Sequence, residues 1–284
     1  MKNPVQKVLV LLLVVALCVA PGCAQKSAKD KTPSPTPEPP KEKEVSVAVY
    51  YLKFTSTDAY LVREVHKVKT EKDGRIAAVE ELIKGTPKTP GAATVIPLDT
   101  KVLGIKVDNG LATVDFSREV LKANVGSSGE ALGIQSIVNT LTEFPDIQKV
   151  SFTVEGKVDE QTRDWWGHVG LYDQPFERNL SVVWEPVIWV TSPQPGDKIT
   201  SPVKVTGTAR VFEATVNLRV LDQQGHELAE TFTTATAGAP ERGTFEATID
   251  FPKPSSAQGY VEVFWYSPKD GSELDKVRVP VRFK

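Results

Sequence analysis

The sequence predicts two folded domains in series, an α+β domain followed by an all-β sandwich. Between residues 45 and 154, alternating apolar patterns typical of strands are interrupted by two stretches with helical spacing. From residue 187 to the end, short alternating strands follow one another with turn residues between them. The hydrophobic content of 40% and the charged content of 25% are typical of globular proteins, and 284 residues suffice for two ordinary domains.

The N-terminus has the pattern of an export signal. Lys2 and Lys7 precede an apolar run, Val8–Val19, which leads to small residues before Cys23. A basic start, a short apolar run and small residues at a cleavage site are typical of secretory signals. The run is shorter than the ~20 apolar residues that span a bilayer stably. We therefore predict that residues 1–22 are a signal peptide.

The residues Ala20-Pro21-Gly22-Cys23 resemble the lipobox of bacterial lipoproteins, in which small residues precede a cysteine. This resemblance implies that the Cys23 thiol carries a diacylglyceryl group and that Cys23 becomes the first residue of the mature protein. Two acyl chains suffice for stable membrane attachment. The expected location is the outer face of the cell membrane. The alternative is an ordinary secretory signal that is cut nearby, with Cys23 incidental.

Residues 23–44 are predicted to form a disordered linker that begins with the lipidated cysteine. Residues 24–44 are rich in Pro, Lys, Glu, Ser and Thr and show no apolar periodicity, so they cannot bury enough surface to offset the entropy of ordering. The net charge of -2 and the dispersed Lys and Arg residues give no sign of nucleic-acid binding. Both cysteines, Cys18 and Cys23, fall in the signal region, so the folded part has no thiol for a disulfide, a metal or a nucleophile.

The first domain, residues 45–180, is predicted from its local patterns in chain order. The expected strands are Val45–Tyr51, Tyr60–Val68, Leu103–Val107, Ala112–Phe116 and Val150–Val154. A first helix runs to Lys84 and is ended by Gly85. Ser127 and Glu130 form a capping box that starts a second helix, which stops before Pro145. The order β-β-α-β-β-α-β predicts a mostly antiparallel sheet with both helices on one face.

This order resembles the GerMN domain of bacterial sporulation and spore-germination proteins. The resemblance is carried by IAAVEELIKGTP (Ile76–Pro87), GIKVDNGLATVDFSREV (Gly104–Val120) and the helix–strand unit Gly129–Gly156. The segment from Gly167 to Arg178 is similar to the one that closes such domains. The resemblance implies a role in sporulation or spore germination.

The second domain, residues 187–284, is predicted to be an immunoglobulin-like sandwich. Seven short strands are expected near residues 188–190, 203–208, 216–221, 230–234, 244–251, 260–266 and 276–283. The segments Ser192–Gly225, Gly243–Phe251 and Tyr266–Phe283 resemble the immunoglobulin-like domain that accompanies GerMN in spore-germination proteins. No disulfide is expected between the sheets, because this part of the chain has no cysteine.

The sequence offers no recognisable catalytic or metal-binding set. The three histidines, His66, His168 and His226, do not have the spacing of a metal-binding pair, and neither HExxH nor G-x-S-x-G occurs. We expect each histidine to be a surface or capping residue. We therefore predict a protein that is not an enzyme, with no metal and no cofactor apart from the diacylglycerol on Cys23.

Trp165 and Trp166 are the candidate interaction surface. Adjacent tryptophans in a loop suit stacking on glycan rings or anchoring a protein interface. The alternative is that one of them packs against its own domain and fixes the joint between the domains.

Together these observations predict a lipid-anchored, extracytoplasmic scaffold or assembly factor of sporulation or spore germination in a Gram-positive bacterium. It would act through contacts with envelope or spore-assembly proteins, and nucleic acid is not an expected partner. One alternative is a lipoprotein that binds peptidoglycan or another cell-wall glycan, through Trp165 and Trp166 or through a face of the sandwich. Another is an accessory or sensor subunit of an envelope complex.

Overall fold

The computed structural model describes residues 42–284, so the predicted signal peptide, Cys23 and most of the predicted linker lie outside the described residues. The first domain begins with β1 (Lys43–Phe54), two residues before the predicted boundary at residue 45. The difference arises because Lys43 and Glu44 still pair with the neighbouring strand, opposite Thr70 and Lys69. No helix within residues 42–284 has the length and apolarity needed to cross a membrane.

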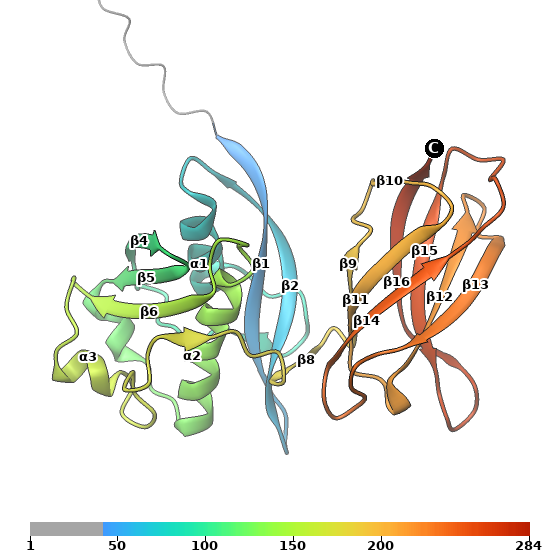
Figure 1. Cartoon of the computed structure of the whole chain (residues 1–284). Helices are drawn as coiled ribbons and strands as arrows, with labels where there is room; N and C mark the ends of the chain where they lie inside the picture. Colours follow the sequence, from blue (N-terminus) through green and yellow to red (C-terminus); the bar gives the residue numbers. More distant parts are fainter. Residues whose placement is uncertain (1–41) are drawn as a thin grey trace, which may run out of the picture. The chain divides into compact units, whose positions relative to one another are not determined.

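The first sheet is built on a long hairpin (Figure 1). All twelve residues of β1 pair antiparallel with β2 (Ala59–Thr70). Two short strands complete the sheet: β3 (Ala92–Ala93) pairs with β1, and β8 (Val183–Glu185) runs parallel to β2. The strand order is β3-β1-β2-β8.

The second sheet has the order β4-β5-β6-β7. Its strands are β4 (Val102–Asp108), β5 (Leu111–Phe116), β6 (Lys149–Val154) and β7 (Phe176–Glu177). Asn109 and Gly110 make the predicted turn between β4 and β5, with φ angles of 47° and 82° that suit a tight hairpin. β5 and β6 are parallel, which requires a crossover connection between them.

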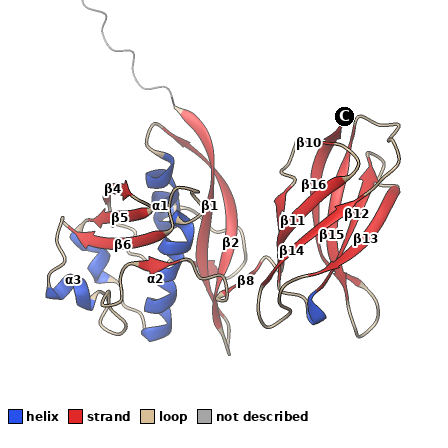
Figure 2. Cartoon of the chain, in the orientation of Figure 1, coloured by secondary structure: helices blue, strands red, loops and turns tan. Residues whose placement is uncertain are grey.

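The helices α1 (Gly74–Lys84) and α2 (Ser127–Leu141) contact strands of both sheets. α1 contacts β1, β2 and β4, whereas α2 contacts β1, β2, β6 and β7 (Figure 2). The predicted α+β class is confirmed, but the single sheet with helices on one face is wrong. The reason is that eleven of the fifteen residues of α2 are buried, and a helix buried nearly all round needs cover on more than one side.

Several elements in this domain were not predicted: the short strands β3, β7 and β8, the 3-10 turn η1 (Arg118–Lys122) and the short helix α3 (Glu160–Asp164). Asp159 caps α3 by accepting a hydrogen bond from the backbone N–H of Thr162 at 2.9 Å. Apolar side chains from both sheets and both long helices form one core, including Tyr51, Phe116, Ile137 and Phe152.

The second domain is a two-sheet sandwich, and all seven predicted strands are confirmed. Its strands are β9 (Ile188–Ser192), β10 (Lys198–Ile199), β11 (Val203–Ala209), β12 (Thr215–Asp222), β13 (Glu227–Thr234), β14 (Gly243–Ile249), β15 (Gln258–Tyr266) and β16 (Glu273–Phe283). The two sheets have the orders β10-β16-β15-β12-β13 and β14-β11-β9. Only the two-residue β10, which runs parallel to β16, and a short 3-10 turn, η2 (Phe212–Ala214), were not foreseen.

The core of the sandwich follows the alternation of its strands. Along β14, Phe245, Ala247 and Ile249 are buried while the residues between them are exposed, as expected for a strand with one face on the core. The buried side chains of the two sheets form an apolar cluster of their own. On β14 the outward positions are polar: Thr244, Glu246 and Thr248.

Candidate functional site

Trp165 and Trp166 are buried in the core of the first domain. Their exposed fractions are 3% and 7%, and their rings stack with centroids 5.5 Å apart. The Trp165 ring also packs on Phe152 at 5.6 Å, and the Trp166 indole N–H donates to the carbonyl of Val120 at 2.8 Å. The prediction that these residues form an interaction surface is therefore wrong. The alternative, packing against their own domain, holds for both.

The loop that carries the tryptophans is held by Glu130. This carboxylate is fully buried and accepts hydrogen bonds from the backbone N–H groups of His168 at 2.8 Å and Gly170 at 2.7 Å. The predicted capping box is wrong, because α2 begins after Gly126 and has no side-chain cap. Glu130 instead reaches the loop after Trp166, where buried N–H groups need an acceptor. Nothing local in the sequence signals this long-range pairing.

His66 lies in a buried polar cluster, not on the surface as predicted. It is 5% exposed, and its two ring nitrogens lie 2.6 Å from a carboxylate oxygen of Glu81 and 2.7 Å from one of Glu64. Glu64 also accepts from the backbone N–H groups of Lys88 and Thr89, both at 2.8 Å. Burial alone would raise the pKa of Glu64, but these hydrogen bonds outweigh it and lower the pKa. The cluster ties β2 to α1 and to the loop after it.

A second buried cluster surrounds Glu143, just after α2. Its carboxylate accepts from the Tyr50 hydroxyl at 2.6 Å, from Arg63 at 3.0 Å and from Arg178 at 2.5 Å. Arg178 also donates to the carbonyl of Asn139 at 3.0 Å. Charge-assisted hydrogen bonds of this kind are the stronger ones in proteins, and here they join β1, β2, α2 and the closing segment.

The remaining histidines each contact one acceptor: His168 a distant backbone carbonyl and His226 a nearby carboxylate. His168 places a ring nitrogen 2.9 Å from the carbonyl of Val125, and His226 places one 3.0 Å from Asp222 in the β12–β13 turn. Among residues 42–284, there is no group of three or more His, Cys, Asp or Glu side chains that could hold a metal ion. The clusters around His66 and Glu143 connect strands, helices and loops of the first domain.

Exposed apolar side chains mark two surfaces. In the first domain, β4 is the edge strand of its sheet, and Leu103 on it is 52% exposed. Leu98, in the loop before β4, is 67% exposed. In the second domain, Phe232 on β13 and Tyr266 on β15 are 69% and 43% exposed. An exposed apolar side chain beside an unpaired strand edge can contact a strand added from another protein.

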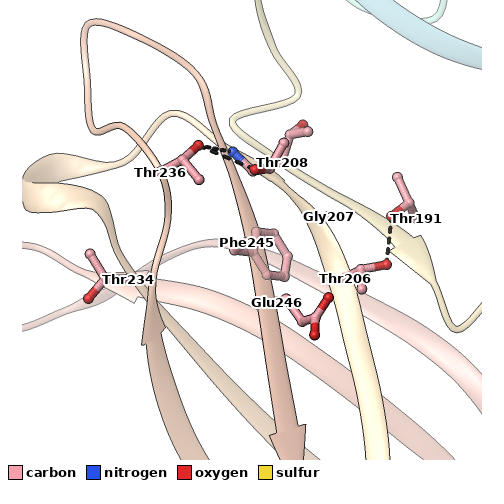
Figure 3. A pocket seen from close by; sticks show the side chains of 9 residues that line it. Thr191, Thr206, Gly207, Thr208, Thr234, Thr236, Phe245 and Glu246 are labelled. Carbon is pink, nitrogen blue, oxygen red and sulfur yellow. Dashed lines mark hydrogen bonds between the residues drawn. The ribbon is translucent and has the colours of Figure 1, made fainter.

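A cleft lies on the three-stranded sheet of the sandwich (Figure 3). It has a volume of about 510 Å³. Its walls are made mainly of threonines, and its lining is Thr191, Thr206, Gly207, Thr208, Thr234, Thr236, Thr244, Phe245 and Glu246. Threonine hydroxyl and methyl groups together form most of its lining.

The fold thus defines a two-domain protein, an α+β domain with helices between two sheets followed by an immunoglobulin-like sandwich. Residues 48–160 match the family described as sporulation and spore germination, and residues 187–272 match the immunoglobulin-like domain of bacterial spore germination. The chain therefore carries these two domains in the order that the sequence resemblances predicted.

The spore germination protein GerM of Bacillus subtilis (strain 168) is 35% identical over 119 residues, which are 39% of this chain and 31% of that protein. The match thus spans less than two thirds of the curated relative's length. Among solved structures, the tandem GerMN domains of GerM from Bacillus subtilis are 30% identical, with a TM-score of 0.39 over 49% of this chain and 46% of that one. The first GerMN domain of the same protein is 24% identical, with a TM-score of 0.40 over 47% and 98%.

Proposed function

We propose that this protein is a lipid-anchored, extracytoplasmic scaffold that assembles partner proteins during sporulation or spore germination and catalyses no reaction itself. The tandem of two germination-associated domains supports the process. The lipobox-like sequence at Cys23 supports the anchor. The ionisable clusters of the first domain support the absence of catalysis, because their carboxylates are engaged in ion pairs and backbone hydrogen bonds between elements.

The observation that carries the scaffold proposal is the free edge of β4. This strand ends its sheet, so one side of its backbone has no strand partner among the described residues. An edge strand presents unpaired N–H and C=O groups that can add a strand from another protein. Leu103, 52% exposed on this strand, supplies apolar surface beside those groups. The edge therefore offers both the hydrogen bonds and the apolar contact of a protein interface.

Site-specific crosslinking in sporulating cells tests the proposal. A photoreactive residue replaces Lys106, which is exposed on β4, and a matched control replaces Glu160, which is exposed on α3. We expect a defined protein adduct from position 106 alone, and its loss when Leu103→Glu is added. Equal labelling from both positions, or an adduct that survives Leu103→Glu, would overturn the proposed role of the β4 edge.

A further inference from the structure

The threonine-lined cleft of the sandwich is formed mainly by side chains of three neighbouring strands. The face of the sheet β14-β11-β9 carries Thr206 and Thr208 on β11 and Thr244 on β14, and Thr191 joins them from β9. Thr191 and Thr206 hydroxyl oxygens lie 2.9 Å apart. Figure 3 shows this pair on one side of the cleft and Thr236 with Thr208 on the other. The cleft therefore crosses all three strands.

The chemistry of the lining favours a neutral ligand. Among the nine described residues that line the cleft, only Glu246 is ionisable, and its carboxylate forms an exposed ion pair with Lys204 at 2.8 Å. No lysine or arginine lines the cleft to attract a phosphate or a carboxylate. Each threonine presents a hydroxyl, which both donates and accepts, beside a methyl group. A sugar ring offers the matching combination of hydroxyl edges and C–H faces.

A hydrogen bond from Arg242 also fixes Thr208, one residue of the cleft lining. Thr208, 8% exposed, accepts a hydrogen bond from Arg242 at 3.2 Å, which leaves its own hydroxyl proton free to donate. Arg242 is fixed in turn by the carbonyls of Val183 at 3.0 Å and Pro186 at 2.6 Å. Desolvation lowers the pKa of Arg242 to about 10, which leaves it protonated at neutral pH. The hydroxyl of Thr208 is therefore pre-oriented.

Gly207 lies between Thr206 and Thr208, and its missing side chain would face the core side of β11, against the buried ring of Phe245. A Cβ atom at this position would lie 2.3 Å from the carbonyl oxygen of Trp189 and 2.5 Å from the ring of Phe245. Any side chain would therefore push β11 away from its neighbours and disturb the threonine array. The cleft volume of about 510 Å³ falls within the range of ~300–1,000 Å³ that is usual for small-ligand sites.

We infer that this cleft binds a short neutral oligosaccharide through its threonine hydroxyls. This binding site is distinct from the β4 edge of the first domain, so either proposal can fail while the other stands. The ligand class follows from the threonine hydroxyl and methyl lining, the single paired carboxylate and the absence of a lysine or arginine among the lining residues. Oligosaccharides of N-acetylhexosamine or glucose units have this chemistry.

The test is an amide NMR titration of the isotope-labelled full-length chain with chitotriose and, separately, cellotriose. We expect saturable shifts confined to the lining residues for at least one of these sugars. The double substitution Thr206→Val/Thr244→Val keeps side-chain shape but removes two hydroxyls, and is expected to weaken binding by about tenfold. The control Thr248→Val changes an exposed threonine of the same strand outside the cleft and should leave affinity unchanged.

Thr206→Ser provides a second check. This change keeps the hydroxyl and removes the methyl group, so it should retain most of the affinity. Absence of saturable shifts with both sugars would overturn the inference. So would unchanged affinity in the folded Thr206→Val/Thr244→Val variant, as judged by amide shifts that match the parent chain outside the cleft. Inorganic phosphate that competes as well as the sugars would reassign the cleft to anions and overturn it too.

Discussion

Glu130 shows how one residue determines the position of a whole loop. It is fully buried, yet its hydrogen-bond partners His168 and Gly170 lie about forty positions further along the chain. The carboxylate satisfies N–H groups that burial of Trp165 and Trp166 would otherwise leave without acceptors. The burial of the two tryptophans and the position of Glu130 are therefore parts of one arrangement.

Replacing this carboxylate tests that arrangement. Glu130→Gln keeps the size of the side chain but turns an amide N–H₂ toward one of the backbone donors, and we expect a loss of ~2 kcal/mol in the free energy of unfolding. Urea unfolding followed by tryptophan fluorescence measures it. The control Glu160→Gln alters an exposed carboxylate on α3 and should change little. Equal stability of both variants would contradict the role of Glu130.

Glu143 illustrates a buried ion pair whose protonation is coupled to folding. Burial alone would raise the pKa of this carboxyl, but the hydrogen bonds and charges of Arg63 and Arg178 outweigh it and lower the pKa. A carboxyl whose pKa is lowered by folding adds stability above its unfolded pKa, ~4.3 for glutamate. This stability is lost as the pH falls through the lower, folded pKa.

We therefore expect Glu143→Gln to lower the free energy of unfolding by an amount that depends on pH. At pH 7 the substitution leaves Arg63 and Arg178 without their buried partner and should cost ~3 kcal/mol of unfolding free energy. The difference from the parent chain should shrink as the pH falls below the unfolded pKa of ~4.3 and then through the lower pKa of folded Glu143. Denaturant melts between pH 3 and pH 7 measure it. Glu177→Gln, at an exposed ion pair, serves as the control, and a pH-independent difference would refute the coupling.

At the scale of elements, α2 decides how the first domain packs. Its sequence shows apolar residues at helical spacing, which predicted one buried face. In the structure, Gly133, Ser136, Asn139 and Thr140 are buried as well, because sheets and the tryptophan loop surround the helix. Small and hydrogen-bonded polar residues on the remaining faces allow this close approach. Helical periodicity identifies the apolar face of the helix. It does not indicate whether small or polar residues on its other faces are also buried.

Gly133→Ala tests the close packing of α2 against the tryptophan loop. In an exposed helix interior, Gly→Ala stabilises by ~1 kcal/mol. Here a Cβ atom would lie 2.4 Å from the Trp166 ring and 2.8 Å from Val95, so we expect a net loss of ~1–3 kcal/mol. The same change at Gly74, where the nearest atom of Phe144 lies at 3.6 Å, should not destabilise. Thermal unfolding of the two variants compares them directly, and a stabilised Gly133→Ala would contradict the packing.

At the scale of the whole molecule, the proposed function depends on the N-terminal cysteine. Cys23 lies outside the described residues, so the anchor is supported by sequence alone. The net charge of -2 and the dispersed basic residues offer no other means of attachment to an anionic membrane surface. A diacylated cysteine would supply stable attachment.

Cys23→Ser should abolish lipid labelling and release the protein from the membrane fraction, because serine provides no thiol for acylation. Metabolic labelling with a fatty acid and intact mass of the mature N-terminus measure both effects. Cys18→Ser is the matched control and should leave labelling intact. Lipid-labelled Cys23→Ser protein, or a mature chain that starts elsewhere, would show that the anchor model is wrong.

Much of the local structure was predictable from sequence. The seven strands of the sandwich, the β4–β5 turn at Asn109 and Gly110, and both long helices follow from residue alternation, helical spacing and turn chemistry over a few neighbouring positions. The order of the two domains follows from the same patterns and from the sequence resemblances. Short elements such as β7 and β8 escaped prediction, because two or three residues carry no periodicity.

The tertiary structure decided what depends on residues far apart in the chain. Strand alternation does not specify which strands pair, so the division of the first domain into two sheets around α2 emerged only from packing. The burial of Trp165 and Trp166 depends on Glu130, and the threonine cleft depends on residues of β9, β11 and β14 meeting on one face. The sequence by itself determined the elements, their order and the candidate anchor. Long-range packing determined which side chains are buried and which remain available for binding.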